Sequence, residues 1–440
     1  MTVRASELAA PLQVGIATRD VTPDGPIWLA GYAARTRPSE KVDCRLLAEA
    51  IAFRSSPADP VVLVSLDNCE VSRAFTDPVL RALAEKRGLG PGRVMIISSH
   101  THAGPVVEGP LLPMYHLAPA EREAVMKYGR FLRDQLFEVV CAALDDLKPA
   151  TLEHGLGRAT FAANRRVYQD DKIVGGANLD GPVDWDVPVL RIKGPDNAIR
   201  AILYGYACHG TSMQGTDFYL VSGDYMAYAR QYLEAIYPGA IAAYLTGMGA
   251  DSNPFPRGRM LDAKRHGLEL AGAVAGVLDR PMRPVSGELK FAYQEVVLPL
   301  AEPPNRQQLE TDAQNPDIYI KQRAQAYLDM LDKGQKPPES VKLPMAAIRI
   351  GDDLTFLAMG GEVVVDYATR LKRLLAADHP WLIGYAYEVP CYIPSVRILK
   401  EGGYEPDSSL IYYGLYGPFR SQIEQILVSK MVELAGAVRQ

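Results

Sequence analysis

The chain has 440 residues, of which 48% are hydrophobic and 22% charged, and its formal net charge is -5. A chain of this length can bury a large core, so we expect one large domain over residues 1–440. The acidic balance argues against nucleic acid and anionic membrane surfaces as partners, and no stretch is apolar enough to be a transmembrane segment. We expect a small-molecule substrate as partner, with the oligomeric state open and a homo-oligomer allowed.

Targeting and cysteine usage point to a reducing compartment. The first residues, Met1 to Ser6, lack the apolar region of a secretory signal, which predicts a cytoplasmic protein. The five cysteines contain no Cys-x-x-Cys pair, so neither a thiolate metal cage nor a disulfide framework is expected.

The N-terminal part alternates between predicted strands and helices. Residues 14–17, 46–53 and 61–66 are apolar enough for strands, and residues 77–87 and 118–147 have helical periodicity. Asp67 follows the third strand, either as a functional carboxylate or as a cap for the next helix. The alternation predicts an α/β fold with a mixed β-sheet core and flanking helices.

Two histidines follow the next predicted strand, residues 94–98. They belong to Ser99-His100-Thr101-His102, and the chain has only seven histidines. On a continuing strand residues i and i+2 share one face, so both imidazoles could face one cavity. This predicts a metal site in which one histidine is a ligand and the other supports it or shuttles protons. The alternative is a hydrogen-bonded pair in a turn.

Further polar residues follow predicted strands along the chain. Residues 201–207 end before His209, and residues 354–359 end before Glu362. Residues 241–245 open into a glycine-rich loop that lacks the lysine of a P-loop, so we expect close backbone approach to a substrate there rather than nucleotide binding. Residues 225–235 and 418–438 are predicted helices, residues 343–350 a strand, and the polar segment 302–341 an insertion or a bridge between halves. Nitrogen and oxygen ligands in loops at strand ends fit Zn²⁺ with an open coordination position.

The chain resembles the neutral (non-lysosomal) ceramidases through four motifs. Ser99-His100-Thr101-His102-Ala103-Gly104-Pro105 is similar to the family's Ser-His-Thr-His-Ser-Gly-Pro, and the segment around His209 and the pair Gly361-Glu362 are similar to two other ligand segments. Tyr392 precedes Tyr404-Glu405 by the family's spacing. The resemblance implies that zinc is held by His100, His209, Glu362 and Tyr392, with His102 beside it.

Two further segments resemble the family with an instructive difference. Asn164-Arg165 is similar to an Asn-Arg pair near the reacting carbonyl, although Arg165 could instead be a structural ion-pair partner. Ala250-Asp251-Ser252-Asn253-Pro254 aligns with Gly-Asp-Val-Ser-Pro, so Asn253 replaces a serine proposed to act in amide cleavage. A shift of one residue would give that role to Ser252. The family's C-terminal immunoglobulin-like domain is not expected in this chain.

These observations predict a zinc-dependent hydrolase that cleaves a C–N amide bond with a metal-activated water. His102 or Asp251 would be the general base and support, Arg165 and Asn253 would stabilise the oxyanion, and Tyr404 would line the pocket or donate a proton. The motif loops carry many polar side chains, which favours a small polar substrate over ceramide. The alternatives are hydrolysis of an ester or sugar-derived substrate, and a non-catalytic, metal-stabilised binding protein. The polar side chains of the motif loops that favour a polar substrate are Arg165, Arg166, Tyr168, Asp224, Tyr225, Arg257, Tyr385 and Tyr387.

Overall fold

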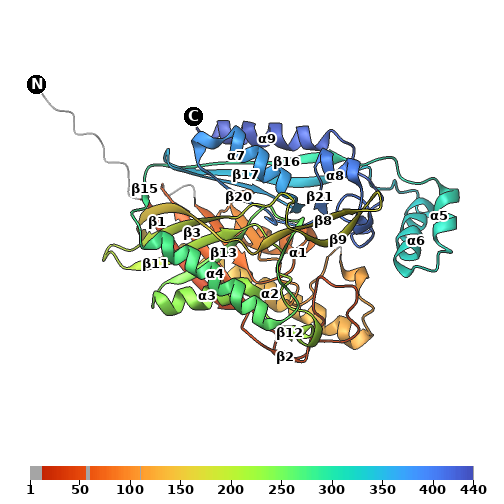
Figure 1. Cartoon of the computed structure of the whole chain (residues 1–440), viewed down its shortest axis with the longest axis horizontal. Coiled ribbons are helices and arrows are strands. Elements are labelled where there is room, and N and C mark those ends of the chain that lie inside the picture. Colours follow the sequence, from red (N-terminus) through yellow and green to blue (C-terminus); the bar gives the residue numbers. More distant parts are fainter. Residues whose placement is uncertain (1–11, 56–59, 110, 440) are drawn as a thin grey trace, which may run out of the picture.

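The computed structural model describes residues 12–55, 60–109 and 111–439 (Figure 1). Three sheets of four or five strands form the body, and helices cover their outer faces. This arrangement confirms the expected α/β class with a mixed β-sheet core. No helix in the described ranges is long and apolar enough to cross a membrane.

The first sheet has the strand order β5-β4-β3-β1-β6. Strands β4 and β5 are parallel, whereas β1 pairs antiparallel with β3. Helices α1 and α2 pack on one face, where their apolar side chains join those of β3 and β4. The bounds are β1 Gln13–Asp20, β3 Leu47–Arg54, β4 Val61–Leu66, β5 Val94–Ser98, β6 Lys148–Pro149, α1 Arg73–Arg87 and α2 Pro119–Asp145.

The second sheet has the order β13-β11-β10-β7-β15, and its parallel pair is β11 with β13. Helices α3 and α4 cover its outer face. The bounds are β7 Thr151–Arg158, β10 Asp186–Lys193, β11 Ile199–Tyr206, β13 Ile241–Thr246, β15 Arg283–Val285, α3 Asp224–Ile236 and α4 Met260–Leu278.

The third sheet has the order β16-β17-β18-β20, with β18 and β20 parallel. Helices α7 and α9 lie along it in Figure 1 and share its core. The bounds are β16 Leu289–Pro299, β17 Ser340–Ile350, β18 Leu354–Met359, β20 Pro380–Ile383, α7 Val365–Leu374 and α9 Ile423–Ala437.

The three sheets meet around one apolar core. Buried side chains of β4 and β5, of β11 and β13, and of β18 and β20 belong to the same cluster. Because each of these pairs is parallel, their carboxyl ends bring the following loops together. The expectation of a site at strand ends therefore has a structural basis.

Short strands complete the layout. β14, β8 and β9 form a three-stranded sheet, β19 pairs with β21, and β2 pairs with β12. Their bounds are β2 Lys41–Val42, β8 Ala162–Gln169, β9 Lys172–Asn178, β12 Leu220–Val221, β14 Ser252–Pro254, β19 Glu362–Val363 and β21 Tyr392–Ile393. The remaining helices are α5 Arg306–Asp312, α6 Ile318–Asp332, α8 Val396–Glu401 and the 3-10 turns η1 Leu112–Met114, η2 Gly215–Asp217, η3 Ala376–Asp378 and η4 Ser408–Ile411.

Several predicted bounds differ from the structure. Helix α1 begins at Arg73 rather than at residue 77, because the Ser72 hydroxyl accepts a hydrogen bond from the Phe75 amide and caps it. Helix α9 begins at Ile423, five residues after the predicted start. The polar segment 302–341 forms α5 and α6, which pack on each other and on Tyr416 and lie at the edge of the body in Figure 1.

Candidate functional site

The loops that carry His100 and His209 are joined by their backbones. The Gly210 amide donates to the His100 carbonyl at 3.3 Å, and the His102 amide donates to the Gly210 carbonyl at 2.9 Å. The strand does not continue through this loop, since β5 ends at Ser98 and His100 has a φ of 60°. The shared-face argument was therefore wrong, and it is the turn that brings the Nε2 atoms of His100 and His102 to 3.2 Å.

Glu362 and Tyr392 lie directly opposite each other in the parallel pair β19 and β21. Glu362 Oε2 is 3.1 Å from His100 Nε2 and 3.3 Å from His209 Nε2. The Tyr392 hydroxyl is 3.3 Å from the same His209 nitrogen. All four side chains expected as ligands thus converge, and His100, His209 and Glu362 are close enough to hold one metal ion.

The charge states of this group suit a cation. Burial alone would raise the pKa of Glu362, but the imidazoles of His100 and His209 hold it well below its usual range. Burial and the charge of Arg165 lower the pKa of His209 to about 3, so this ring is neutral at pH 7. A buried carboxylate facing two imidazole nitrogens and a phenol is a donor set that fits Zn²⁺.

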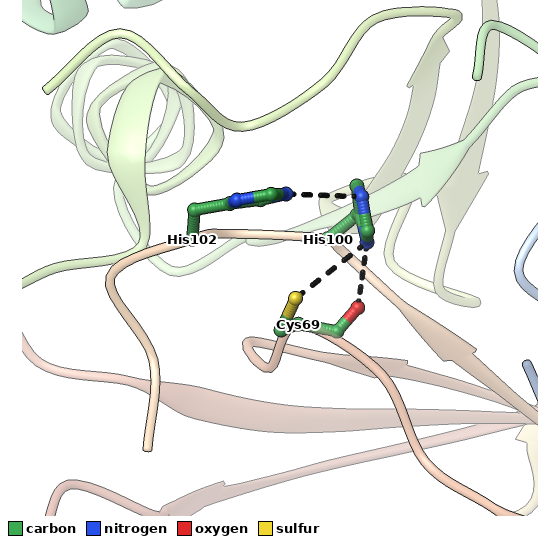
Figure 2. A group of neighbouring side chains, drawn as sticks. All are labelled: Cys69, His100 and His102. Atoms are coloured by element: carbon green, nitrogen blue, oxygen red, sulfur yellow. Dashed lines mark hydrogen bonds between the residues drawn. The ribbon is translucent and has the colours of Figure 1, made fainter. Parts of the chain in front are cut away.

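A second group, Cys69 with His100 and His102, is a weaker metal candidate (Figure 2). His100 Nδ1 is 2.8 Å from the Cys69 carbonyl oxygen and donates to it, which leaves Nε2 for the side facing Glu362. His102 lies beside Nε2 of the His100 ring and Cys69 beside its Nδ1, so the three side chains do not surround a common position for a metal ion. Burial also raises the pKa of the Cys69 thiol well above its usual range, which disfavours the thiolate that metals bind.

A chain of buried hydroxyl and carboxyl groups supports the other oxygen of Glu362. The Tyr413 hydroxyl is 2.7 Å from Glu362 Oε1 and 3.1 Å from Glu70 Oε2. A phenol has one proton and cannot donate to both. Burial and the charge of Glu362 raise the pKa of Glu70 well above its usual range, so protonated Glu70 donates to Tyr413, which donates to Glu362. The Tyr385 hydroxyl is 3.3 Å from Glu362 Oε2. Sequence reasoning missed this support.

Arg165 is both an ion-pair partner and a site residue. Its Nε donates to Glu405 at 2.8 Å, and its Nη1 is 3.1 Å from His209 Nε2. The His209 lone pair can serve this guanidinium or a metal ion, but not both. Arg165 also lies over the rings of Tyr392 and Tyr404, 5.4 Å from each centroid. Its Nη2 is buried and has no hydrogen-bond partner within the described ranges.

Asp251 connects the site to the scaffold. Its Oδ1 accepts from the Val365 amide at 2.8 Å, and its Oδ2 accepts from Asn164 Nδ2 at 3.0 Å. Burial raises the pKa of Asp251 to about 6. Since both oxygens are engaged by donors away from the cleft, the geometry favours its support role and leaves His102 as the expected base.

The residues after Asp251 decide which side chain reaches the substrate. Asn253 lines the cleft, and its Oδ1 accepts from the Thr211 hydroxyl at 3.3 Å, which leaves its amide nitrogen available as a donor. Ser252 points the other way along β14 and is fully buried. The gapless alignment with Asn253 at the serine position therefore agrees with the structure.

The site opens into a cleft of about 370 Å³. One wall is the β8–β9 hairpin, which sequence reasoning missed although Asp170-Asp171 between two alternating segments is a hairpin turn signal. A larger cavity of about 540 Å³ beside Trp381 contains none of the four expected ligands. The cleft is lined by Gly31, Tyr32, His102, Arg165, Arg166, Ile173, Val174, Gly175, Gly176, His209, Thr211, Asn253, Arg257, Tyr404 and Glu405.

Part of the expected polar rim lies elsewhere. Of the eight polar residues expected around the pocket, only Arg165, Arg166 and Arg257 line the cleft. The Tyr225 hydroxyl is buried and donates to a backbone carbonyl, and Tyr168 is on the exposed face of the hairpin. The remaining residues of the expected polar rim that lie outside the cleft are Asp224, Tyr385 and Tyr387.

Two other loop features have roles in the scaffold. The glycine-rich loop packs on the protein itself, since a Cβ on Gly249 would lie 3.0 Å from Ala207 Cα and overlap its carbonyl. Asp67 does not cap α1, because its carboxylate accepts from the Leu47 amide and pairs with Arg230 at 2.7 Å.

Comparison with known proteins shows the family of the chain and structures with a similar fold. The family described as "Neutral/alkaline non-lysosomal ceramidase, N-terminal" matches residues 12–244. The neutral ceramidase from Pseudomonas aeruginosa has a similar structure, with a TM-score of 0.73 and 20% identity over 98% of this chain and 75% of that one. A structure described as "Ceramidase complexed with C2" gives a TM-score of 0.73 and 19% identity with the same coverage.

At such identities the two structures establish a common fold. No curated protein matches the chain significantly. The family match covers more than half of the chain and includes the loops of His100 and His209. The chain therefore belongs to the neutral/alkaline non-lysosomal ceramidase family and is a ceramidase-like hydrolase.

Proposed function

We propose that this protein is a zinc-dependent hydrolase that cleaves the C–N amide bond of a small polar molecule. The observation that carries the proposal is the convergence of His100, His209, Glu362 and Tyr392 beside the cleft. Two imidazoles, a carboxylate and a tyrosine oxygen suit Zn²⁺, and a catalytic zinc site keeps a position open.

When bound, zinc supplies a water of lowered pKa and polarises the substrate carbonyl as a Lewis acid. His102 is the base because of its place beside the ligands, with its Nε2 3.2 Å from His100 Nε2. Burial and the neighbouring imidazoles of His100 and His209 lower its pKa well below its usual range, so the ring is neutral and its free nitrogen can accept a proton. It takes a proton and passes it to the leaving amine nitrogen. The guanidinium of Arg165 and the side-chain amide of Asn253, which both line the cleft, donate to the carbonyl oxygen as negative charge develops there.

The cleft supports a small polar substrate. Its volume of about 370 Å³ is near the lower end of the usual range for small-molecule sites, roughly 300–1,000 Å³. Three arginines line it, whereas Ile173 and Val174 supply its only aliphatic side chains among the described residues. Tyr404 lies at the mouth with 41% of its surface exposed and can contact the acyl part of a substrate.

Elemental analysis followed by substrate screening tests the proposal. Wild-type protein and His116→Ala, a change at an exposed histidine outside the cleft, should each bind about one zinc, whereas His100→Ala should lose it. The zinc-loaded protein should then release amine from small N-acyl compounds. Faster cleavage of the matched esters would favour the ester alternative. Bound zinc without hydrolysis of any amide or ester would favour a binding protein, and a metal-free wild type would refute the zinc mechanism.

A further inference from the structure

Arg257 is the cleft arginine without an ionic partner. It follows β14, it is exposed, and no carboxylate of the described residues forms an ion pair with it. A solvent-exposed arginine is ordinary by itself. Arg257 differs from such a residue because it lines the cleft in which the amide bond would be cleaved.

The other two arginines of the cleft are neutralised by the protein. Arg165 pairs with Glu405, and Arg166 pairs with both Glu405 and Glu401. Arg257 therefore leaves the cleft with an excess of positive charge, although the whole chain has a formal charge of -5. Such a local reversal of charge favours an anionic ligand.

The loop that presents Arg257 is held in place on both sides. The Gly258 amide donates to the Ser212 carbonyl at 2.8 Å, directly beyond the His209 loop. The Pro256 carbonyl accepts from His266 Nε2 at 2.6 Å. An arginine on an anchored loop loses less conformational freedom on binding, which makes it suitable for recognition.

Tyr32, a ring neighbour of His102, lines the same cleft as Arg257. Burial raises the pKa of Tyr32, and the positive charge of Arg257 opposes this effect. The Tyr32 ring packs against His102 with centroids 4.8 Å apart. Because His102 passes the proton to the leaving nitrogen, the amine part of the substrate lies on the His102 side of the cleft.

We propose that the substrate carries a carboxylate on its amine part, as in an N-acyl amino acid, and that Arg257 binds this carboxylate. The inference rests on the proposed function and narrows its substrate class. The planar guanidinium offers parallel N–H donors that match the two oxygens of a carboxylate. In the reaction, the hydroxyl of water adds to the acyl carbon, the C–N bond breaks, and the second proton of water leaves on the amine. The products are a carboxylic acid and an amino acid.

Three amides with one acyl group test this inference. N-butanoyl-β-alanine, N-butanoylethanolamine and N-butanoylphosphoethanolamine differ only in ending with a carboxylate, a hydroxyl or a phosphate. The assay measures kcat/KM from released primary amine, for wild type, Arg257→Gln, Arg257→Lys and Arg259→Gln. Arg259 is a matched control because it lies two residues away, pairs with Asp262 and is 64% exposed outside the cleft.

We expect wild type and Arg259→Gln to prefer the carboxylate by tenfold or more over the hydroxyl. Arg257→Gln should lose about ten- to hundredfold on the carboxylate substrate and less than twofold on the hydroxyl substrate, and Arg257→Lys should retain more. Equal losses on both substrates, or no preference in wild type, would overturn the inference while the hydrolase proposal stands. Preference for the phosphate over the carboxylate would overturn the assignment of a carboxylate.

Calorimetry with uncleavable sulfonamide analogues separates recognition from chemistry. If wild type cleaves none of the amides, the proposed function fails. Tighter binding of the β-alanine sulfonamide than of the ethanolamine sulfonamide, lost in Arg257→Gln, would still support anion recognition by Arg257. Equal binding of the two by wild type would overturn it.

Discussion

Replacing Tyr413 by phenylalanine should weaken zinc binding without removing any ligand. The change deletes the hydroxyl that lies 2.7 Å from Glu362 Oε1 and 3.1 Å from Glu70 Oε2. A hydrogen bond to a buried charged group contributes about 1.5–3 kcal/mol, and groups that orient metal ligands typically change metal affinity about 10–100-fold. We therefore expect a loss of about tenfold or more in zinc affinity.

Competition with a chromophoric chelator measures the zinc affinity, and urea unfolding of the metal-free protein measures the free energy of unfolding. Tyr128→Phe is the matched control, because Tyr128 is equally buried and its hydroxyl donates to an uncharged carbonyl, that of Val21, at 2.8 Å. Both variants should lose about 1–3 kcal/mol of unfolding free energy. The reasoning is refuted if Tyr413→Phe binds zinc as tightly as Tyr128→Phe does.

Two further predictions concern a glycine and a buried carboxylate. Gly31 has a φ of +91°, and a Cβ there would lie 2.5 Å from Cγ of His102, whereas Gly88 has a φ of +68° with open space around it. Gly31→Ala should therefore lower both the stability of the protein and its kcat, whereas Gly88→Ala should lower the stability alone, by about 1 kcal/mol. Calorimetry would measure the stability and amide hydrolysis the kcat. Equal kcat values in the two variants would contradict the proposed contact with His102. Burial raises the pKa of Asp251 from 3.8 to about 6, so the folded state binds this proton more tightly and the associated stability is present below about pH 4 and lost as the pH rises through 6. Asp251→Asn lacks this loss, so its deficit in urea unfolding should shrink by about 2 kcal/mol between pH 4 and pH 7, and a constant deficit would argue against the raised pKa.

Elements with a local signal could be predicted from the sequence. The buried strand β4 Val61–Leu66 has the expected bounds because a short apolar run encodes it directly. Strands β8 and β9 carry polar side chains to solvent on one face, and the hydrophobic pattern alone did not reveal them. Their turn did carry a signal, since Asp170 and Asp171 both adopt the left-handed conformation of a two-residue hairpin.

The same distinction applies to the site. His100 and His209 lie in compact motifs at strand ends, so residue type and neighbours were enough to suggest them. Tyr413 reaches Glu70 across 343 positions of sequence, and no local pattern marks either residue. Contacts between residues so far apart in sequence depend on how the sheets pack together, which cannot be inferred from local sequence patterns. The buried support of a metal site is therefore less predictable than its ligands.

The arrangement around Asn253 bears on the identity of the nucleophile. A side-chain nucleophile would have to line the cleft with a hydroxyl or thiol that is free to lose its proton. Among the described residues, the aliphatic hydroxyl that lines the cleft belongs to Thr211, and it donates to Asn253 Oδ1, which fixes the asparagine as a donor. Ser252 is buried on the other face of β14, so it cannot take the position that Asn253 occupies. With asparagine there, the proposed mechanism assigns oxyanion stabilisation and nucleophilic attack to different groups, and we expect a water molecule to be the nucleophile.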